Sequence, residues 1–271
     1  MMQASFFEKI SKAHQTPKTL PGVAAIDTFV EMLMQFLFPD LSEQRLQNPL
    51  AIHTRYQQLQ LHFEQLLLHT EACPNHAERT LTNCFFERLE AVYDACLEDS
   101  EAILAGDPAA IDQKEVIRAY PGFWAIAVYR VAHLMWELKI PYLPRIFTEY
   151  AHARTGIEIH PAATIGRRFC IDHGTGIVIG ETTHIGDDVK IYQGVTLGAL
   201  SVSKAMAQQK RHPSIGDRVV IYAGATILGG ETFIGHDSII GGNVWLTNSV
   251  APHSRVYYSS KGQQVLSSQE D

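Results

Sequence analysis

Two short segments in the second half of the chain carry side chains suited to proton transfer and ligand binding. Residues 172–176 read Asp-His-Gly-Thr-Gly, and residues 210–213 read Lys-Arg-His-Pro. Histidine is the usual general base near neutral pH, because its ordinary pKa lies close to the working pH. The glycines that follow His173 leave room for a ligand to approach. We therefore predict that His173 is a general base.

The residues from Ile159 to Val250 follow a six-residue period that must position both segments. A strand has a period of two and a helix a period of 3.6, so neither explains six. Hexads predict a triangular coil of three short strands, about 18 residues per turn, and we expect a left-handed parallel β-helix. The aliphatic positions of the repeat are Ile159, Ile165, Ile171, Ile179, Ile185, Ile191, Leu197, Ile215, Ile221, Ile227, Ile234, Ile240 and Leu246.

Two further positions of the hexad are regular. Glycine often follows the aliphatic residue, and we expect it to suit a tight corner where other residues meet steric limits. Four positions after the aliphatic residue stands a small or branched residue, which is expected to share the interior. Thr175 occupies one of these positions, and Phe169 is a larger exception.

Two of the three interruptions of the repeat contain the candidate residues His173, Arg211 and His212. The step from Ile171 to Ile179 is eight residues and contains His173, and the step from Ile227 to Ile234 is seven. Leu197 and Ile215 are 18 residues apart, so twelve residues leave the coil as an extruded loop. Long excursions from a regular scaffold are often functional.

The residues before Gly156 have helical spacing instead. Apolar residues crowd residues 59–68, recur at three- and four-residue steps over 85–96, and continue at helical spacing over 124–138. Asp107 before Pro108 is typical of an N-cap with proline at the first helical position. The sequence predicts an α+β protein: an α-helical domain over residues 1–155, a β-helix catalytic domain over 156–254 and a C-terminal tail over 255–271.

Composition narrows the function classes. The formal charge is −7, from 22 basic and 29 acidic residues, which disfavours nucleic acid as a partner. Residues 1–20 lack the apolar core of a secretion signal, and no apolar run is long enough to span a membrane. We expect a cytoplasmic protein with reduced thiols and no metal, since no metal-ligand motif includes its cysteines, Cys73, Cys84, Cys96 and Cys170.

Four motifs together resemble serine O-acetyltransferases, which belong to the hexapeptide-repeat acyltransferases. They are Glu-Ile-His-Pro from residue 158, Ile-Asp-His-Gly-Thr-Gly-Ile-Val-Ile-Gly-Glu from 171, Gln-Gly-Val-Thr-Leu-Gly from 193 and Lys-Arg-His-Pro from 210. Asp-Pro-Ala from residue 107 and segments within 122–136 are similar to the helical domain of that family. The resemblance covers residues from about 90 to 250. It implies transfer of acetyl from acetyl-CoA to the hydroxyl of L-serine, giving O-acetyl-L-serine for cysteine biosynthesis.

The resemblance also implies catalytic roles for named residues. His173 would take the proton of the serine hydroxyl as that oxygen attacks the thioester, and Glu158 would orient His173. His212 would join them in the active site, and with Arg211 it would hold the carboxylate of serine.

The ammonium and cofactor sites follow from the same resemblance. Asp172 and Asp107 would hold the ammonium of serine, with Asp107 acting from the helical domain across a subunit boundary. Lys204, with Lys210 and Arg211, would give an acidic protein a basic patch for CoA. The residues implied along the acetyl-CoA groove, beside Lys204, are Gly198, Ala199, Ala223, Gly224, Gly241 and Gly242.

Three features depart from the usual pattern of that family. Glu158 stands where aspartate is common, and Gly-Ala-Leu from residue 198 replaces Gly-Gly-Thr at the loop entrance. The altered entrance leaves open another hydroxyl acceptor, such as homoserine. The chain ends in Gln-Glu-Asp without the terminal isoleucine through which many members bind O-acetylserine sulfhydrylase, so that complex is doubtful.

Assembly and two rival functions complete the expectations. A triangular prism offers flat faces, and such solenoids form threefold trimers, which the helical domain would join into hexamers; the sequence leaves trimer and hexamer open. A zinc lyase like γ-class carbonic anhydrase would need three converging histidines, and the histidines here lack that pattern. A non-catalytic scaffold for a cysteine-synthesis partner is the other alternative. Feedback inhibition by cysteine also stays open.

Overall fold

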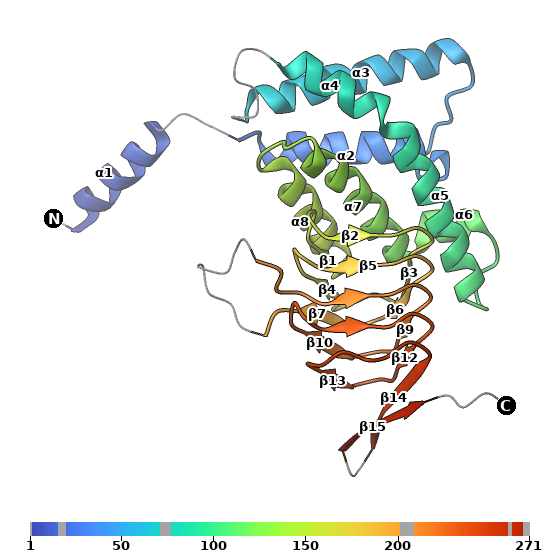
Figure 1. Ribbon diagram of the computed structural model, residues 1–271. Coiled ribbons are helices and arrows are strands. Elements are labelled where there is room, and N and C mark those ends of the chain that lie inside the picture. The colour runs from blue at the N-terminus through green and yellow to red at the C-terminus, as the bar shows by residue number, and fades with distance from the viewer. Residues whose placement is uncertain (1, 16–19, 71–76, 201–208, 260–261, 268–271) are drawn as a thin grey trace.

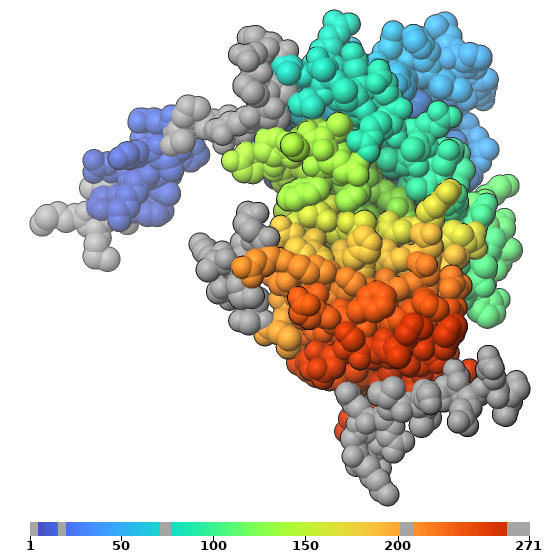
Figure 2. Space-filling model, viewed as in Figure 1, coloured from blue at the N-terminus to red at the C-terminus, as the bar shows by residue number. Residues whose placement is uncertain are grey.

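The computed structural model describes residues 2–15, 20–70, 77–200, 209–259 and 262–267. Helices come first and short strands follow (Figure 1). Figure 2 shows the helical part seated as a cap over one end of the strand-built part. The helices are α1 (Met2–Gln15), α2 (Val23–Leu37), the 3-10 turn η1 (Pro39–Leu41), α3 (Pro49–Leu68), α4 (Glu78–Glu87), α5 (Leu89–Gly106), α6 (Gln113–Ala119), α7 (Pro121–Glu137) and α8 (Leu143–Thr155).

Two details of the helical part differ from the sequence-based expectation. The apolar pattern over residues 85–96 belongs to two helices, because α4 ends and α5 begins at Arg88. The N-cap prediction for Asp107 was wrong: Asp107 is the C-cap of α5, and the next helix begins six residues later with Asp112 as its N-cap. Asp107 instead accepts a hydrogen bond from the N–H of Ala109 within a turn.

The strands form the three faces of a left-handed parallel β-helix, which confirms the predicted fold. From β1 to β13 every third strand stacks on the same face: β1, β4, β7, β10 and β13 on one, β2, β5, β8 and β11 on the second, and β3, β6, β9 and β12 on the third, which β14 extends. The strands are β1 (Glu158–Ile159), β2 (Thr164–Ile165), β3 (Cys170–Asp172), β4 (Val178–Ile179), β5 (His184–Ile185), β6 (Lys190–Tyr192), β7 (Thr196–Gly198), β8 (Ser214–Ile215), β9 (Val220–Ile221), β10 (Thr226–Leu228), β11 (Phe233–Ile234), β12 (Ile239–Ile240), β13 (Trp245–Leu246), β14 (Ser254–Ser259) and β15 (Gly262–Ser267).

The interruptions of the hexad leave the register of the stack intact. Ile159 pairs with Ile179 across the eight-residue step, and Ile227 pairs with Leu246 across the seven-residue step. Leu197 pairs with Ile227 although the twelve extra residues lie between them. The middle of that excursion, residues 201–208, lies outside the described residues, but its two ends return to adjacent coils. Extra residues therefore leave at corners, and the aliphatic column continues inside.

The interior matches the hexad except at the eight-residue step. Thr175 is exposed there, and Ile177 takes the interior position instead, with Ile171 and Ile179 on either side. Phe169 is fully buried although it is large. The core thus keeps its aliphatic filling, while His173, Thr175 and Gly176 are exposed.

The glycines that follow the aliphatic residues serve a different purpose from the one expected. The left-handed corner positions are held by non-glycine residues such as Arg168, Asp188 and Arg218, which have φ near +55°. A Cβ at Gly166 would lie 2.6 Å from the backbone of Gly186, and one at Gly216 would lie 2.8 Å from a backbone nitrogen of the next coil. These glycines are required because successive coils stack too closely for any side chain.

A buried ion pair attaches the helical part to the first coil. Asp99 of α5 is fully buried and paired with Arg130 of α7, with 2.8 Å between Nη2 and Oδ1. Asp99 also accepts from the N–H of Phe169, and Arg130 donates to the carbonyl of Gly166. Breaking such a pair leaves an unpaired buried charge and costs about 3–5 kcal/mol. The end of α5 is therefore held at a fixed place beside the solenoid.

Strand β14 extends the third face of the solenoid. Strand β14 pairs in parallel with β12, and β15 turns back on β14 as an antiparallel hairpin. Among the residues that the structure describes, no helix combines the length and hydrophobicity that crossing a lipid bilayer requires.

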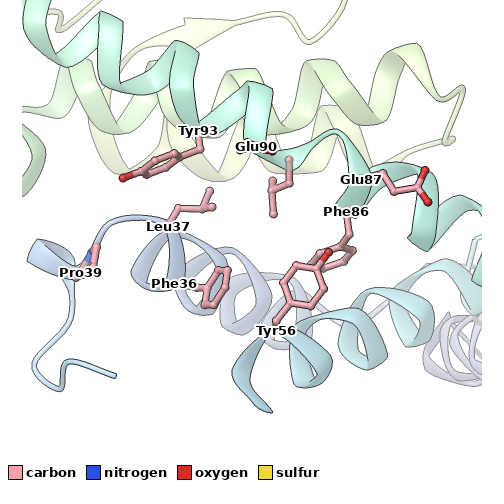
Figure 3. A pocket seen from close by; sticks show the side chains of 9 residues that line it. Phe36, Leu37, Pro39, Tyr56, Phe86, Glu87, Glu90 and Tyr93 are labelled. Carbon is pink, nitrogen blue, oxygen red and sulfur yellow. The ribbon is translucent and has the colours of Figure 1, made fainter. Parts of the chain in front are cut away.

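The helical part also contains a cavity of about 510 Å³ (Figure 3). Apolar side chains of α2, α3 and α5, among them Phe36, Tyr56 and Tyr93, line it together with Phe86 of α4. None of the candidate site residues lines this cavity. The candidate residues lie elsewhere, on the solenoid and, for Asp107, at the end of α5.

Candidate functional site

His173 lies at the corner where the chain turns from β3 to β4. Its φ is +60°, the left-handed conformation that Arg168, Asp188 and Arg218 also adopt at corners of the solenoid. The imidazole is 70% exposed, and its Nε2 lies 3.7 Å from Oδ1 of Asp172. Gly174 must be glycine, because a Cβ there would meet the side chain of Ile157 at 2.5 Å. The eight-residue step thus presents a free imidazole on a rigid corner.

Asp172 is bound to a lysine that the sequence reasoning missed. Its Oδ2 lies 2.9 Å from Nζ of Lys190, and both side chains are mostly buried. The pairing of β3 with β6 explains this contact, since Cys170 aligns with Lys190 and Asp172 with Tyr192. No motif marks Lys190, because only the stacking of two coils brings it beside Asp172.

Asp107 reaches the same corner from the end of α5. Its Oδ2 accepts a hydrogen bond of 2.7 Å from the hydroxyl of Tyr120, and its Oδ1 one of 2.8 Å from the N–H of Ala109. These bonds, helped by the positive charges of Lys190 and nearby His173, hold the pKa of Asp107 below its ordinary value. Asp107 is therefore a carboxylate at neutral pH, and it interacts electrostatically with His173 of its own chain.

Arg211 and His212 lie at a different corner, just before β8, where they pack against the turn from β4 to β5. The backbone N–H groups of both residues donate to the hydroxyl of Thr182 at 3.0 Å. Arg211 forms an ion pair with Glu181. A Cβ at Gly180 would overlap the imidazole of His212, so glycine is needed to seat that ring. The returning end of the excursion is thus fastened to the coil by residues 180–182.

His212 is a neutral donor in this setting. Its ring is 8% exposed, and burial followed by the charge of Arg211 lowers its pKa to about 4. Nδ1 accepts a hydrogen bond of 3.1 Å from the N–H of Thr182, so the ring proton belongs on Nε2. A neutral imidazole with an Nε2–H can donate to a carboxylate.

The two clusters lie at opposite ends of β4. His173, Asp172 and Asp107 share one end, and Arg211 and His212 share the other. A single chain therefore does not bring its predicted base and its predicted carboxylate clamp together.

Glu158 lies on β1, one coil from His173, as the spacing predicts. Its backbone N–H donates to the carbonyl of Ile177, which follows His173 by four residues. Its carboxylate accepts a hydrogen bond of 3.1 Å from Arg145 of α8. Among the described residues, no hydrogen bond or ion pair joins Glu158 to His173.

The residues expected along the acetyl-CoA groove lie at two corners, some on the side of His173 and others on the side of Arg211 and His212. Gly198 ends β7 and Ala199 follows it, on the side of Arg211 and His212. Ala223, Gly224, Gly241 and Gly242 lie on the other side, after β9 and β12, in the coils that continue the corner of His173. Lys204 lies outside the described residues.

A column without side chains runs along the corner of His173. Gly176, Gly194 and Gly224 stack in successive coils, all with φ between +71° and +81°, and a Cβ added to Gly194 would lie 3.4 Å from the Cα of Gly224. Beside this column the rings of Tyr192 and Tyr222 stack in parallel, 5.0 Å apart. The surface below His173 is therefore an exposed strip of backbone edged by two aromatic rings.

A cluster of His236, Asp237 and His253 occupies another corner: His236 and Asp237 precede β12, and His253 precedes β14 in the next coil. Its potential ligand atoms lie within 4.8 Å of one another. Arg218 donates to both oxygens of Asp237, at 2.7 and 2.8 Å, and occupies the carboxylate that a metal would need. We read the cluster as an ion-pair network that ties adjacent coils together.

Several known proteins are similar to this chain in sequence. No family model matches the chain. A plasmid serine acetyltransferase of Synechococcus elongatus is 51% identical over 175 residues, 63% of this chain and 54% of that protein. The serine acetyltransferase of Helicobacter pylori strain 26695 is 50% identical over 165 residues, 61% of this chain and 93% of that protein.

Solved structures are similar over more of the chain. Serine acetyltransferase isoform 3 of Entamoeba histolytica, in complex with cysteine, matches with a TM-score of 0.76 and 33% identity over 94% of this chain and 87% of its own. A serine acetyltransferase in complex with CoA matches with a TM-score of 0.61 and 26% identity, over 89% of this chain and 98% of its own.

Proposed function

This chain belongs to the serine acetyltransferase family, and we propose that acetyl transfer takes place at the corner that carries His173. The reaction moves an acetyl group from the thioester of acetyl-CoA to the hydroxyl of L-serine, giving O-acetyl-L-serine and CoA. The observation that carries the proposal is the free imidazole of His173, held at a rigid corner beside two carboxylates. The family favours serine over homoserine as the acceptor.

His173 acts as the general base. Its imidazole removes the hydroxyl proton as the serine oxygen attacks the thioester carbon, and the tetrahedral intermediate then expels the CoA thiolate, which takes up a proton. A covalent acetyl-enzyme is not needed. Cys170, on the strand that leads to His173, is 5% exposed, and burial raises the pKa of its thiol to about 12.

Glu158 is proposed to orient the imidazole of His173. It lies one coil away, on the face that begins at the same corner. This role requires its carboxylate to turn from Arg145 toward His173. Replacing it by glutamine keeps the shape and removes the charge, so kcat is expected to fall while the KM for serine stays within about twofold.

The serine zwitterion needs one anionic and one cationic clamp. Asp107 offers the anionic clamp beside His173, and Arg211 with the Nε2–H of His212 offers the cationic one. Because one chain holds these clamps at opposite ends of β4, we propose that a second copy supplies Arg211 and His212. A threefold trimer places one corner of each copy against another corner of its neighbour. Pairing of two such trimers through the helical parts is part of the same proposal.

Acetyl-CoA is proposed to lie along the glycine column below His173. Backbone groups at Ala223, Gly224, Gly241 and Gly242 face it from one chain, and Gly198 and Ala199 from the neighbour. A strip without side chains lets a long cofactor approach the backbone closely. The phosphates of CoA would meet the basic residues of the excursion.

The test is CoA release measured with acetyl-CoA and a panel of hydroxyl acceptors. Serine is expected to be the best acceptor, ahead of homoserine. Replacement of His173 by alanine is expected to lower kcat by about 10²- to 10⁴-fold, the usual contribution of a general base. Near-normal turnover by the folded variant would contradict the mechanism.

A further inference from the structure

Helix α1 is amphipathic, and its apolar face is exposed. Ile10 follows Phe6 by four residues and Phe7 by three, which places the three side chains on one side of the helix. Their exposed fractions are 41%, 58% and 65%, and every side chain described from Ser5 to Gln15 is exposed. Figure 1 shows α1 standing apart from the other helices. Each of the other α-helices that the structure describes contributes buried side chains.

A helix of this length gains little stability from its own hydrogen bonds. Isolated helices shorter than about 12–15 residues are marginal in water, and most helical stability in proteins comes from packing of an apolar face. In α1 the rings of Phe6 and Phe7, 5.8 Å apart, both face solvent. A group of exposed aromatic side chains of this kind marks an interaction surface. We therefore looked for a surface against which α1 can pack.

The cavity of about 510 Å³ in the helical part is such a surface. In Figure 3, Phe36 and Tyr56 border it from α2 and α3, and Tyr93 borders it from α5. Ring contacts hold the walls, since Tyr56 lies edge-on to Phe86 with 5.1 Å between the ring centroids and 6.1 Å from Phe36. Cavities of about 300–1,000 Å³ accommodate bound groups. An aromatic side chain inserted here meets rings that favour edge-to-face contacts.

The rim of the cavity is acidic, whereas the helix carries lysine. Glu87 and Glu90 line the cavity, and neither forms an ion pair with a residue that the structure describes. Burial, followed by the charge of Glu87, raises the pKa of Tyr56, so this carboxylate acts on the cavity wall. Lys9 follows Phe6 by three residues, at the edge of the apolar face, and has no ion-pair partner in the described part of the chain. The helix and the cavity are therefore complementary in both apolarity and charge.

The length of the chain favours the cavity of a second copy over the cavity of the same copy. The cavity lies near Phe36 and Leu37, about 20 Å along α2 from Val23 at 1.5 Å per residue. The seven residues 16–22 that join α1 to α2 span at most about 24 Å when fully extended. Reaching the cavity of the same chain would use nearly all of this length, whereas the cavity of a second copy imposes no such limit.

We propose that α1 of one copy docks in the cavity of a second copy, with Phe6 and Ile10 among its aromatic walls and Lys9 beside Glu87 and Glu90. The contact is isologous: each copy donates one helix and receives one, so two copies close around a twofold axis. Making the contact twice brings the buried area closer to the roughly 1,000 Å² that a stable interface needs. The inference goes beyond acetyl transfer, and it rests on the proposed function only in supplying the contact that pairs two trimers.

Phe6→Glu is expected to disrupt this pairing, because it places a carboxylate among apolar walls with an acidic rim. The dissociation constant of the pair should rise about 30-fold or more, as when a central aromatic side chain is lost from an interface. Ser5→Glu adds the same charge on the opposite side of α1 and is the matched control, which should pair like the wild type. Sedimentation velocity over a concentration series measures this, and the wild type should have twice the mass of Phe6→Glu. Equal masses at all concentrations would overturn the proposal.

A charge exchange tests the orientation of the helix. Lys9→Glu and Glu90→Lys are each expected to raise the dissociation constant about 3- to 10-fold, because each brings like charges together. The double variant restores an opposite pair, so its dissociation constant should return to within about threefold of the wild-type value. If the two losses simply added in the double variant, Lys9 would not meet the acidic rim and the docking would be wrong.

Cross-linking distinguishes a second copy from the same chain. In a background of Cys73→Ser and Cys84→Ser, the pair Lys9→Cys and Glu90→Cys should be joined between copies by a short bismaleimide, giving a covalent dimer on a denaturing gel. The pair Ser5→Cys and Glu90→Cys uses the opposite side of the helix and should give none. Links within single chains, or equal dimer yields from both pairs, would overturn the proposal.

These measurements are separable from the proposed function. Neither α1 nor the cavity contains a residue of the proposed site, so the rate of CoA release per chain should stay within about twofold in Phe6→Glu. If the wild type released no CoA with serine, the proposed function would fail, while the mass and cross-linking results would still decide whether α1 docks in a second copy.

Discussion

The two ends of β4 make opposite use of a histidine. At the end nearer β3, His173 is exposed on a corner, and the helical part contributes Asp107, which is hydrogen-bonded to Tyr120 and interacts electrostatically with His173. At the end nearer β5, His212 is buried, neutral and fastened by Thr182. The first is suited to exchange protons with a substrate, and the second to hold a fixed donor. The difference indicates that the corners at the two ends of β4 each carry half of the proposed site.

The largest expected effect outside His173 comes from removing the cationic half. Arg211→Ala should raise the KM for serine by about 10- to 100-fold, since a hydrogen bond between charged groups is worth about 1.5–3 kcal/mol. The KM for acetyl-CoA should rise much less. Initial-rate kinetics with each substrate varied measure this, and an equal rise for both would mean that Arg211 serves CoA rather than serine.

A smaller effect is expected from the residue that fastens this half. Thr182→Val removes the hydroxyl that accepts from the N–H groups of Arg211 and His212. Each lost bond is worth about 1 kcal/mol, so the KM for serine should rise about 3- to 10-fold.

Thr183 provides a matched control for Thr182. Its hydroxyl is buried and makes no hydrogen bond within the part of the chain that the structure describes. Thr183→Val should therefore leave both kinetics and stability unchanged or improve stability slightly. Equal behaviour of the two valine variants would contradict the role given to Thr182.

The smallest effect concerns pH. The folded-state pKa of His212 is about 4, below the ordinary value of 6.5. The unfolded chain therefore binds more protons between those values, and stability present above pH 6.5 is lost as the pH falls toward 4. Thermal unfolding from pH 7 to pH 5 should show a declining Tm, with a shallower decline in His212→Asn. His160, whose pKa burial also lowers to about 4, should contribute a similar slope, and an unchanged slope in the His212 variant would contradict the assignment.

The six-residue repeat predicted the β-helix because the period of the repeat is set by the local geometry of one coil. A six-residue spacing of aliphatic side chains has one architectural solution, and the breaks at residues 171–179 and 197–215 marked where chain leaves the stack. The reason given for the glycines was wrong, because close stacking of coils is a contact between residues about 18 apart and leaves no trace in one hexad.

The positioning residues could not be read from the sequence. Lys190 meets Asp172 only through the register of β3 and β6, and it meets Gly106 only because the helical part docks there. Tyr120 reaches Asp107 across a turn that the sequence reasoning took for a helix start. Motifs identified groups that do chemistry, whereas the groups that hold them in place depend on tertiary packing.

The central claim is that each site joins one corner of one chain to the other corner of a second copy. Mixing His173→Ala with Arg211→Ala protein under conditions of subunit exchange tests it directly. If the site is shared, a random mixture contains some sites with both residues intact, and activity should rise from near zero to about a quarter of the wild-type value. If activity in a mixture shown to have exchanged subunits stays at the level of the two variants, each chain builds its own site, and the account is wrong.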